Sequence, residues 1–188
     1  MHSVWNMTSK LGYLLLILFL LIGFNQPALA LDARDNRLLW VGAEFFPKIT
    51  HAILPTAPAD QRLILIYSDQ TNKQQAEQVA QSLNEKLNLP YQLQSGFSPH
   101  SFEWDSRYHY FVFITDPSII TPELTRALDQ PNSMTFSPFN RSVEQGIDVG
   151  LHIQAIIRPK INNAQLANKN WSFRPFFSDI AEHYSPGD

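Results

Sequence analysis

Four residues with metal-binding side chains lie within ten positions of one another, and they are His100, Glu103, Asp105 and His109. Zinc accepts their nitrogen and oxygen atoms as ligands, and a zinc site here would indicate a secreted metal-dependent hydrolase. However, Trp104 divides the group, and the spacing matches no recognised pattern of zinc ligands. We therefore interpret the four as solvated loop residues, with His109 on one face of a strand, and predict no metal site.

Polar side chains come directly after two apolar segments, 62–67 and 108–115, that are typical of buried strands. Open α/β sheets bind ligands beyond the carboxyl ends of their strands, beside helix N-termini. The candidate ligand-binding residues at these two ends are Ser68, Asp69, Thr115 and Asp116. The alternative, which we favour for the first end, is that Ser68, Asp69 or Thr71 caps the next helix, because such residues are the usual N-caps.

Aromatic side chains gather in the long irregular segment 95–107. Aromatic rings anchor partners at protein interfaces. The candidate partner-binding residues are Phe97, Phe102 and Trp104. Packing of the segment onto the sheet is the alternative interpretation of these rings.

The common signatures of catalysis are absent from the sequence. It contains no G-x-S-x-G, no Walker-type G-x-x-x-x-G-K, no dinucleotide-binding G-x-G-x-x-G and no H-E-x-x-H. We predict that the protein is not an enzyme, has no catalytic residues and uses no cofactor.

Residues 1–30 have the pattern of a secretory signal peptide. Lys10 precedes an uncharged apolar run over 11–24, and residues 28–30 (Ala-Leu-Ala) form a cleavage site. The run is shorter than the roughly 20 residues of a membrane anchor. We expect cleavage after Ala30, a chain that works in the periplasm, and no membrane insertion after cleavage.

Composition limits the possible partners of the expected chain, 31–188. Removal of residues 1–30 removes one lysine and no acidic residue, which takes the net charge from −3 to −4. Nucleic acids and anionic lipid surfaces bind clustered basic faces, so we exclude them as main partners. The chain has no cysteine, which excludes disulfides and a lipidated N-terminal cysteine.

Hydrophobic periodicity predicts a single α/β domain with a mostly parallel sheet flanked by helices, a C-terminal hairpin and a C-terminal helix. The sequence predicts a kink or an end at Pro47 in the first helix. The expected helices are 36–53, 71–88, 122–129 and 171–184. The expected strands are 62–67, 90–94, 108–115, 133–137 and the hairpin of 146–153 with 155–161.

The C-terminal third carries a family resemblance. The segments that carry it are 136–139 (FSPF), 143–151 (VEQGIDVGL), 158–162 (RPKIN), the Phe-rich stretch to Tyr184 and, more loosely, 38–49 (LLWVGAEFFPKI). Together they resemble the YfiR-like periplasmic proteins. These motifs are turn and packing features and carry no catalytic group.

The resemblance implies a periplasmic regulator that binds the outer domain of an inner-membrane signalling protein, such as a diguanylate cyclase, and holds it inactive. Two features depart from the family. The absence of cysteine excludes a redox-sensing version, and Phe46-Pro47 stands where the family usually has Trp-Pro. A non-enzymatic regulator is therefore our leading hypothesis, and a small-ligand-binding domain of solute-receptor type is the alternative.

Overall fold

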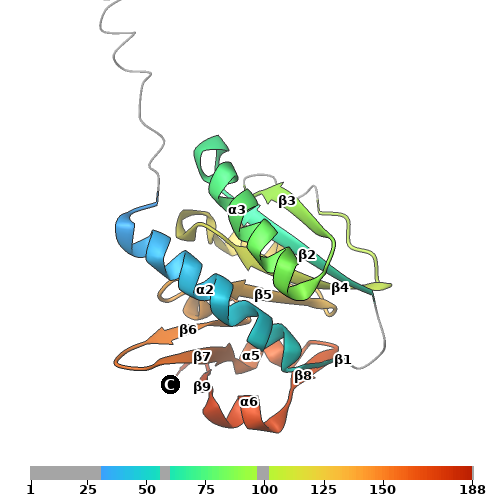
Figure 1. The fold of residues 1–188 in the computed structure, drawn as a ribbon. Coiled ribbons are helices and arrows are strands. Elements are labelled where there is room, and N and C mark those ends of the chain that lie inside the picture. The colour runs from blue at the N-terminus through green and yellow to red at the C-terminus, as the bar shows by residue number, and fades with distance from the viewer. Residues whose placement is uncertain (1–30, 56–59, 97–101, 188) are drawn as a thin grey trace, which may run out of the picture.

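A mostly parallel sheet forms the centre of the protein, whose computed structural model describes residues 31–55, 60–96 and 102–187. The expected signal peptide, Phe97 and His100 lie outside these residues. The seven strands of this sheet have the order β3-β2-β4-β5-β6-β7-β9. The first five run parallel, and β7 pairs antiparallel with β6. The predicted fold class, α/β with a mostly parallel sheet flanked by helices, is confirmed (Figure 1).

The elements expected before residue 163 lie within three residues of their predicted bounds. The helical elements are α2 (Ala33–His51), α3 (Gln70–Leu87), η2 (Pro117–Ile119), α4 (Pro122–Leu128), η3 (Val143–Gln145), α5 (Asn163–Leu166) and α6 (Pro175–Ile180). The strands are β1 (Ile53–Pro55), β2 (Asp60–Tyr67), β3 (Tyr91–Ser95), β4 (Tyr108–Ile114), β5 (Ser133–Ser137), β6 (Val149–Ile153), β7 (Ile157–Asn162), β8 (Trp171–Phe173) and β9 (Glu182–Tyr184).

Helix α2 packs closely on the sheet. The Asp32 carboxylate caps it by accepting the backbone N–H groups of Arg34 and Asp35. At Gly42 a Cβ atom would lie only 2.5 Å from the Pro138 side chain, so glycine permits the close approach. Pro47 does not end the helix, which continues to His51.

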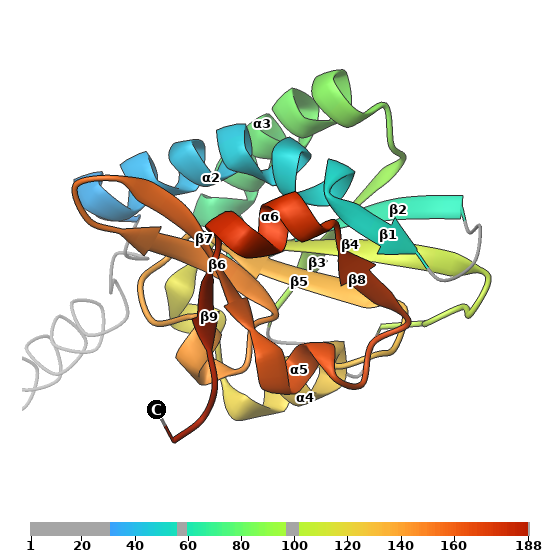
Figure 2. The ribbon, with the colours of Figure 1, turned by 90° about the horizontal axis from the view of Figure 1, so that it is seen from below.

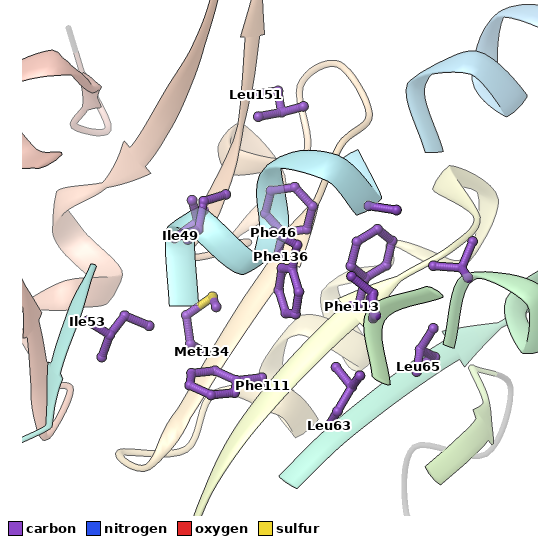
Figure 3. Packing of buried hydrophobic residues seen from close by; sticks show 14 of the residues in the cluster. Phe46, Ile49, Ile53, Leu63, Leu65, Phe111, Phe113, Met134, Phe136 and Leu151 are labelled. Carbon is purple, nitrogen blue, oxygen red and sulfur yellow. The ribbon is translucent and has the colours of Figure 1, made fainter. Parts of the chain in front are cut away.

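Two apolar layers lie on opposite faces of the sheet because side chains alternate along each strand. Leu63 and Leu65 of β2 belong to the larger layer beneath α2 and α3, whereas Ile64 and Ile66 belong to the layer that α4 covers (Figure 2). Figure 3 shows the centre of the larger layer. There the ring of Phe46 lies 5.1 Å from that of Phe113 and 5.2 Å from that of Phe136, between centroids.

The predicted C-terminal helix over 171–184 is wrong. Strand β8 pairs with β1 in a separate two-stranded sheet, and β9 pairs with β7 at the edge of the main sheet. Only Pro175–Ile180 is helical, with Pro175 in its first turn as predicted. Pairing with distant strands satisfies the backbone on either side of α6, and helical spacing of aromatic residues does not reveal such partners.

A buried ion pair fixes the chain between α5 and β8. Lys169 Nζ lies 2.9 Å from Asp129 Oδ1, 3.1 Å from the Gln130 carbonyl and 3.5 Å from Asp148 Oδ1. Asp148 also accepts hydrogen bonds from the backbone N–H and hydroxyl of Thr135. Burial raises the pKa of Asp148, and the charge of Lys169 opposes this rise.

None of the helices in the described part of the chain is long and apolar enough to cross a membrane.

Candidate functional site

The structure brings the polar residues at the ends of β2 and β4 together. We call Ser68, Asn72, Thr115 and Asp116 the carboxyl-end cluster, and all four are buried. The side-chain amide of Asn72 donates to Ser68 Oγ at 2.6 Å and to Asp116 Oδ2 at 2.7 Å. Sequence reasoning missed Asn72. Its position one turn after Ser68 on an expected helix was the available signal.

The remaining polar atoms at this end also bond to the protein. Asp116 Oδ1 accepts from the Ser118 N–H at 2.8 Å, and Thr115 Oγ1 donates to the Ile66 carbonyl at 2.8 Å. Asp69 is the N-cap of α3 and accepts from two backbone N–H groups, which confirms the capping prediction. The cluster thus holds strands and helix together, and the main hydrogen-bonding groups of the four predicted residues have partners within the chain.

The three described residues among those first considered as metal ligands, Glu103, Asp105 and His109, do not form one group. His109 is buried near the amino end of β4, with its ring 4.9 Å from that of Phe111 and 6.3 Å from that of Trp171 of β8. Its predicted place on one face of a strand is confirmed, but it is not solvated. Asp105 pairs instead with Arg107, and His100 lies outside the described residues. Within residues 31–55, 60–96 and 102–187, no cluster of three or more His, Cys, Asp or Glu side chains is arranged to hold a metal.

Burial has a clear electrostatic effect on His109. Desolvation, aided by the charge of Lys169, lowers the pKa of the imidazole to about 4. Its Nε2 atom has no hydrogen-bond partner among the described residues. The side chain is therefore neutral at pH 7 and belongs to the core.

Phe102 and Trp104 lie at the opposite end of the sheet from the cluster, near the amino ends of β2 and β4. Their rings stack with centroids 5.6 Å apart, and the rings of Trp104 and Tyr110 make an edge-to-face contact with centroids 4.9 Å apart. Both rings are half-buried. They pack on the sheet, in agreement with the alternative prediction, yet they also border a cleft of about 930 Å³.

We call this cavity the amino-end cleft. Its principal lining residues are Arg62, Gln92, Phe102, Trp104, Tyr108 and Tyr110. The sheet supplies four of them, because β2, β3 and β4 turn alternate side chains toward this face. The segment 102–106 forms the opposite wall.

Two arginines contact one aromatic ring in the cleft region but differ in their pairing. The guanidinium of Arg62 lies 4.3 Å from the centroid of Tyr108, and that of Arg107 lies 5.6 Å from it. Arg107 is bound to the Asp105 carboxylate at 2.6 Å, and this hydrogen bond lowers the pKa of Asp105. Among the described residues, Arg62 makes no such hydrogen bond. Sequence reasoning missed Arg62, although it is the only charged residue of the expected strand 62–67.

An apolar hollow of about 770 Å³ lies between the end of α2, the β6–β7 hairpin and α6. We call it the α6 groove and define it by Phe45, Lys48, Ile156, Arg158, Phe176 and Ile180. The exposed fractions of its three projecting apolar residues are 64% for Ile156, 61% for Phe176 and 57% for Ile180.

Only part of the C-terminal stripe of apolar residues is buried. Phe177 is buried against Phe173, with 4.7 Å between ring centroids. Phe176 and Ile180 face outward because α6 is a single short helix that turns only one side to the core. Their spacing of four residues was the sequence signal for a shared face.

Polar side chains with basic groups outnumber the acidic one around the α6 groove. Lys48, His51 and Arg158 line it together with one acidic residue, Asp179. Lys48 Nζ lies 5.2 Å from the centroid of Phe45. In the described ranges none of these four forms an ion pair.

No family model matches the chain, and no curated protein matches it.

Proposed function

We propose that this chain is an exported, non-enzymatic regulator that binds an inner-membrane signalling protein in the α6 groove and restrains its activity. The observation that carries the proposal is the exposure of Ile156, Phe176 and Ile180 around one hollow. Contiguous apolar groups of this kind on a soluble domain mark interaction sites. Burying the exposed parts of the three side chains would contribute on the order of 4 kcal/mol to binding.

The chemistry of the groove indicates what kind of segment occupies it. Lys48, His51 and Arg158 give its rim a basic character, although the chain as a whole is acidic. An amphipathic helix that places apolar side chains in the groove and carboxylates at its rim is complementary in shape and charge. We assign such a helix to the periplasmic part of the signalling protein.

Two sequence features support the location and the partner class. Residues 1–30 have the pattern of a signal peptide, which would deliver the chain to the periplasm. The resemblance of 134–184 to YfiR-like proteins implies restraint of a protein such as a diguanylate cyclase, and α6 with its exposed Phe176 and Ile180 belongs to that stretch.

Site-specific photo-cross-linking in the native bacterium tests the docking surface. A photoreactive residue at position 176 should cross-link to an inner-membrane protein with a cytoplasmic signalling domain. The matched control is Tyr91, which is 39% exposed on the edge strand β3, far from the groove, and should give no such product. Equal cross-linking of the same protein from both positions would contradict docking in the groove.

Genetic complementation tests the restraint. Deletion of the gene should raise cyclic-di-GMP if the partner is a diguanylate cyclase, and the wild-type gene should restore the original level. A gene carrying Phe176→Ser and Ile180→Ser should not restore it, although the protein should keep its melting temperature because both side chains are exposed. Unchanged cyclic-di-GMP after deletion would contradict restraint of a cyclase and would favour ligand capture.

A further inference from the structure

We propose that the amino-end cleft binds a planar aromatic carboxylate, with the ring of the ligand on Trp104 and Phe102 and its carboxylate on Arg62. This site goes beyond the docking function, because the cleft and the α6 groove share no lining residue. Its volume of about 930 Å³ lies at the upper end of the range of small-molecule sites, roughly 300–1,000 Å³.

The wall of the cleft is suited to a flat ring. Phe102 and Trp104 stack with an angle of only 18° between their planes. Trp104 is held in turn by the edge contact with Tyr110, and the Tyr110 hydroxyl accepts the Asp105 N–H at 3.0 Å. The half-buried rings are therefore fixed before a ligand arrives, and aromatic stacking contributes to binding with little ordering cost.

Arg62 supplies the group that would recognise an anion. The guanidinium carbon lies over the ring of Tyr108, and an arginine in such a contact can still donate its N–H groups to an anion. A carboxylate matches this fork of donors by two parallel hydrogen bonds. Arg107 contacts the same ring but its donors bind Asp105, so Arg62 is the arginine available for a ligand.

The acidic residues of the cleft limit the charge of the ligand. Asp105 is neutralised by Arg107, whereas Glu103 lines the cleft and forms no ion pair among the described residues. Its carboxylate repels a second negative charge on a ligand. This favours a monoanionic carboxylate over a phosphate monoester, which carries nearly two charges at neutral pH.

Calorimetric titration of the chain that begins at Leu31 tests the assignment, with naphthoate as the probe. Naphthoate should bind measurably, while acetate, which lacks the ring, should not. Arg62→Gln should weaken naphthoate binding about tenfold, the usual scale for one charge-assisted interaction. The same variant should leave the weaker binding of uncharged naphthylmethanol unchanged. Trp104→Leu should weaken the binding of both aromatic probes.

Matched variants determine whether the probe binds in the cleft or elsewhere on the protein. Arg158→Gln removes an arginine that lies outside the cleft and should change naphthoate affinity less than about twofold. Phe176→Ser should not change naphthoate affinity, because Phe176 lies in the α6 groove. A loss of affinity in this variant would place the probe in that groove. Absence of naphthoate binding up to its solubility limit, or equal affinity of the wild type and Arg62→Gln, would overturn the proposal. Tighter binding of adenosine monophosphate would overturn the choice of carboxylate.

Discussion

The two ends of the parallel sheet differ in how their polar groups are used. At the carboxyl ends of β2 and β4, where parallel sheets commonly bind ligands, Asn72 joins Ser68 to Asp116 in a buried network. At the amino ends, Arg62 and Trp104 face a cleft instead. The hydrogen-bonding state of the side chains therefore identifies the candidate site better than its place in the topology does.

The difference arises from the segments that adjoin the strands at each end. The carboxyl ends lead directly into helical turns whose N–H groups need caps, and Asp69 and Asp116 supply them. The amino end of β4 is preceded by the irregular segment 102–107, which has no helix terminus to satisfy. Its polar and aromatic side chains are left to line the cleft.

The first prediction concerns the amino end of the sheet on the face opposite the cleft, where the His109 side chain is buried. The pKa of this imidazole is about 4 in the folded protein and near 6.5 in the unfolded chain. Folding therefore favours the neutral form, and this contribution to stability is present above pH 6.5 and lost as pH falls toward 4. The loss should approach about 3 kcal/mol, measured by urea unfolding across that pH range.

His109→Phe is the control for this prediction, because it keeps an apolar ring beside Phe111 and Trp171 but does not titrate. The raised pKa of Asp148 acts in the opposite direction in both proteins and cancels in the comparison. Parallel stability curves for the wild type and the variant between pH 6.5 and 4 would show that this face is open to water.

The second prediction tests whether the carboxyl-end cluster is structural. Asn72→Ala removes the donor shared by Ser68 and Asp116 and leaves a buried carboxylate short of a partner. The free energy of unfolding should fall by about 2 kcal/mol in urea denaturation.

Gln75→Ala is the matched control on the same helix, since Gln75 donates to Asn36 in an exposed hydrogen bond at 2.6 Å. Gln75→Ala should lower the free energy of unfolding by less than about 0.5 kcal/mol. If both variants lower the free energy of unfolding by the same amount, the carboxyl-end cluster contributes no more to stability than an exposed hydrogen bond, and the prediction is wrong.

Local patterns in the sequence were sufficient for most of the main sheet. Strand 133–137 is observed at its predicted bounds, and the polar stretch before Leu87 forms α3 as its apolar stripe indicates. The pairing of β8 with β1 was not predicted, because it joins Trp171–Phe173 to residues more than a hundred positions earlier. Periodicity within a segment carries no information about such partners.

The sites show the same limit. The sequence indicated the four candidate ligand-binding residues at the carboxyl ends of two strands, and the parallel pairing of β2 with β4 brings these ends together. The α6 groove forms because tertiary packing places Ile156 of the hairpin and Phe176 of α6 around the same hollow. Arg62 became a candidate ligand-binding residue only through its contact with the Tyr108 ring, and no spacing in the sequence indicates this contact.

The third and smallest expected effect on stability concerns the open side of the amino end. Replacing Phe102 by Ala should lower the free energy of unfolding by only about 1 kcal/mol, because its ring is half-buried. The cross-link from position 176 should be unchanged, since the α6 groove lies elsewhere. A loss above about 3 kcal/mol, seen by urea unfolding, would make the ring part of the core.

The most direct test of the contrast between the two ends is one NMR titration with naphthoate. The chain from Leu31 keeps Trp40, Trp104 and Trp171, whose indole N–H signals report three separate places. We predict that the Trp104 signal shifts on titration while the side-chain amide signals of Asn72 stay in place. A shift of Asn72 with an unchanged Trp104 would place the ligand at the carboxyl end and contradict an open amino end opposite a closed carboxyl end.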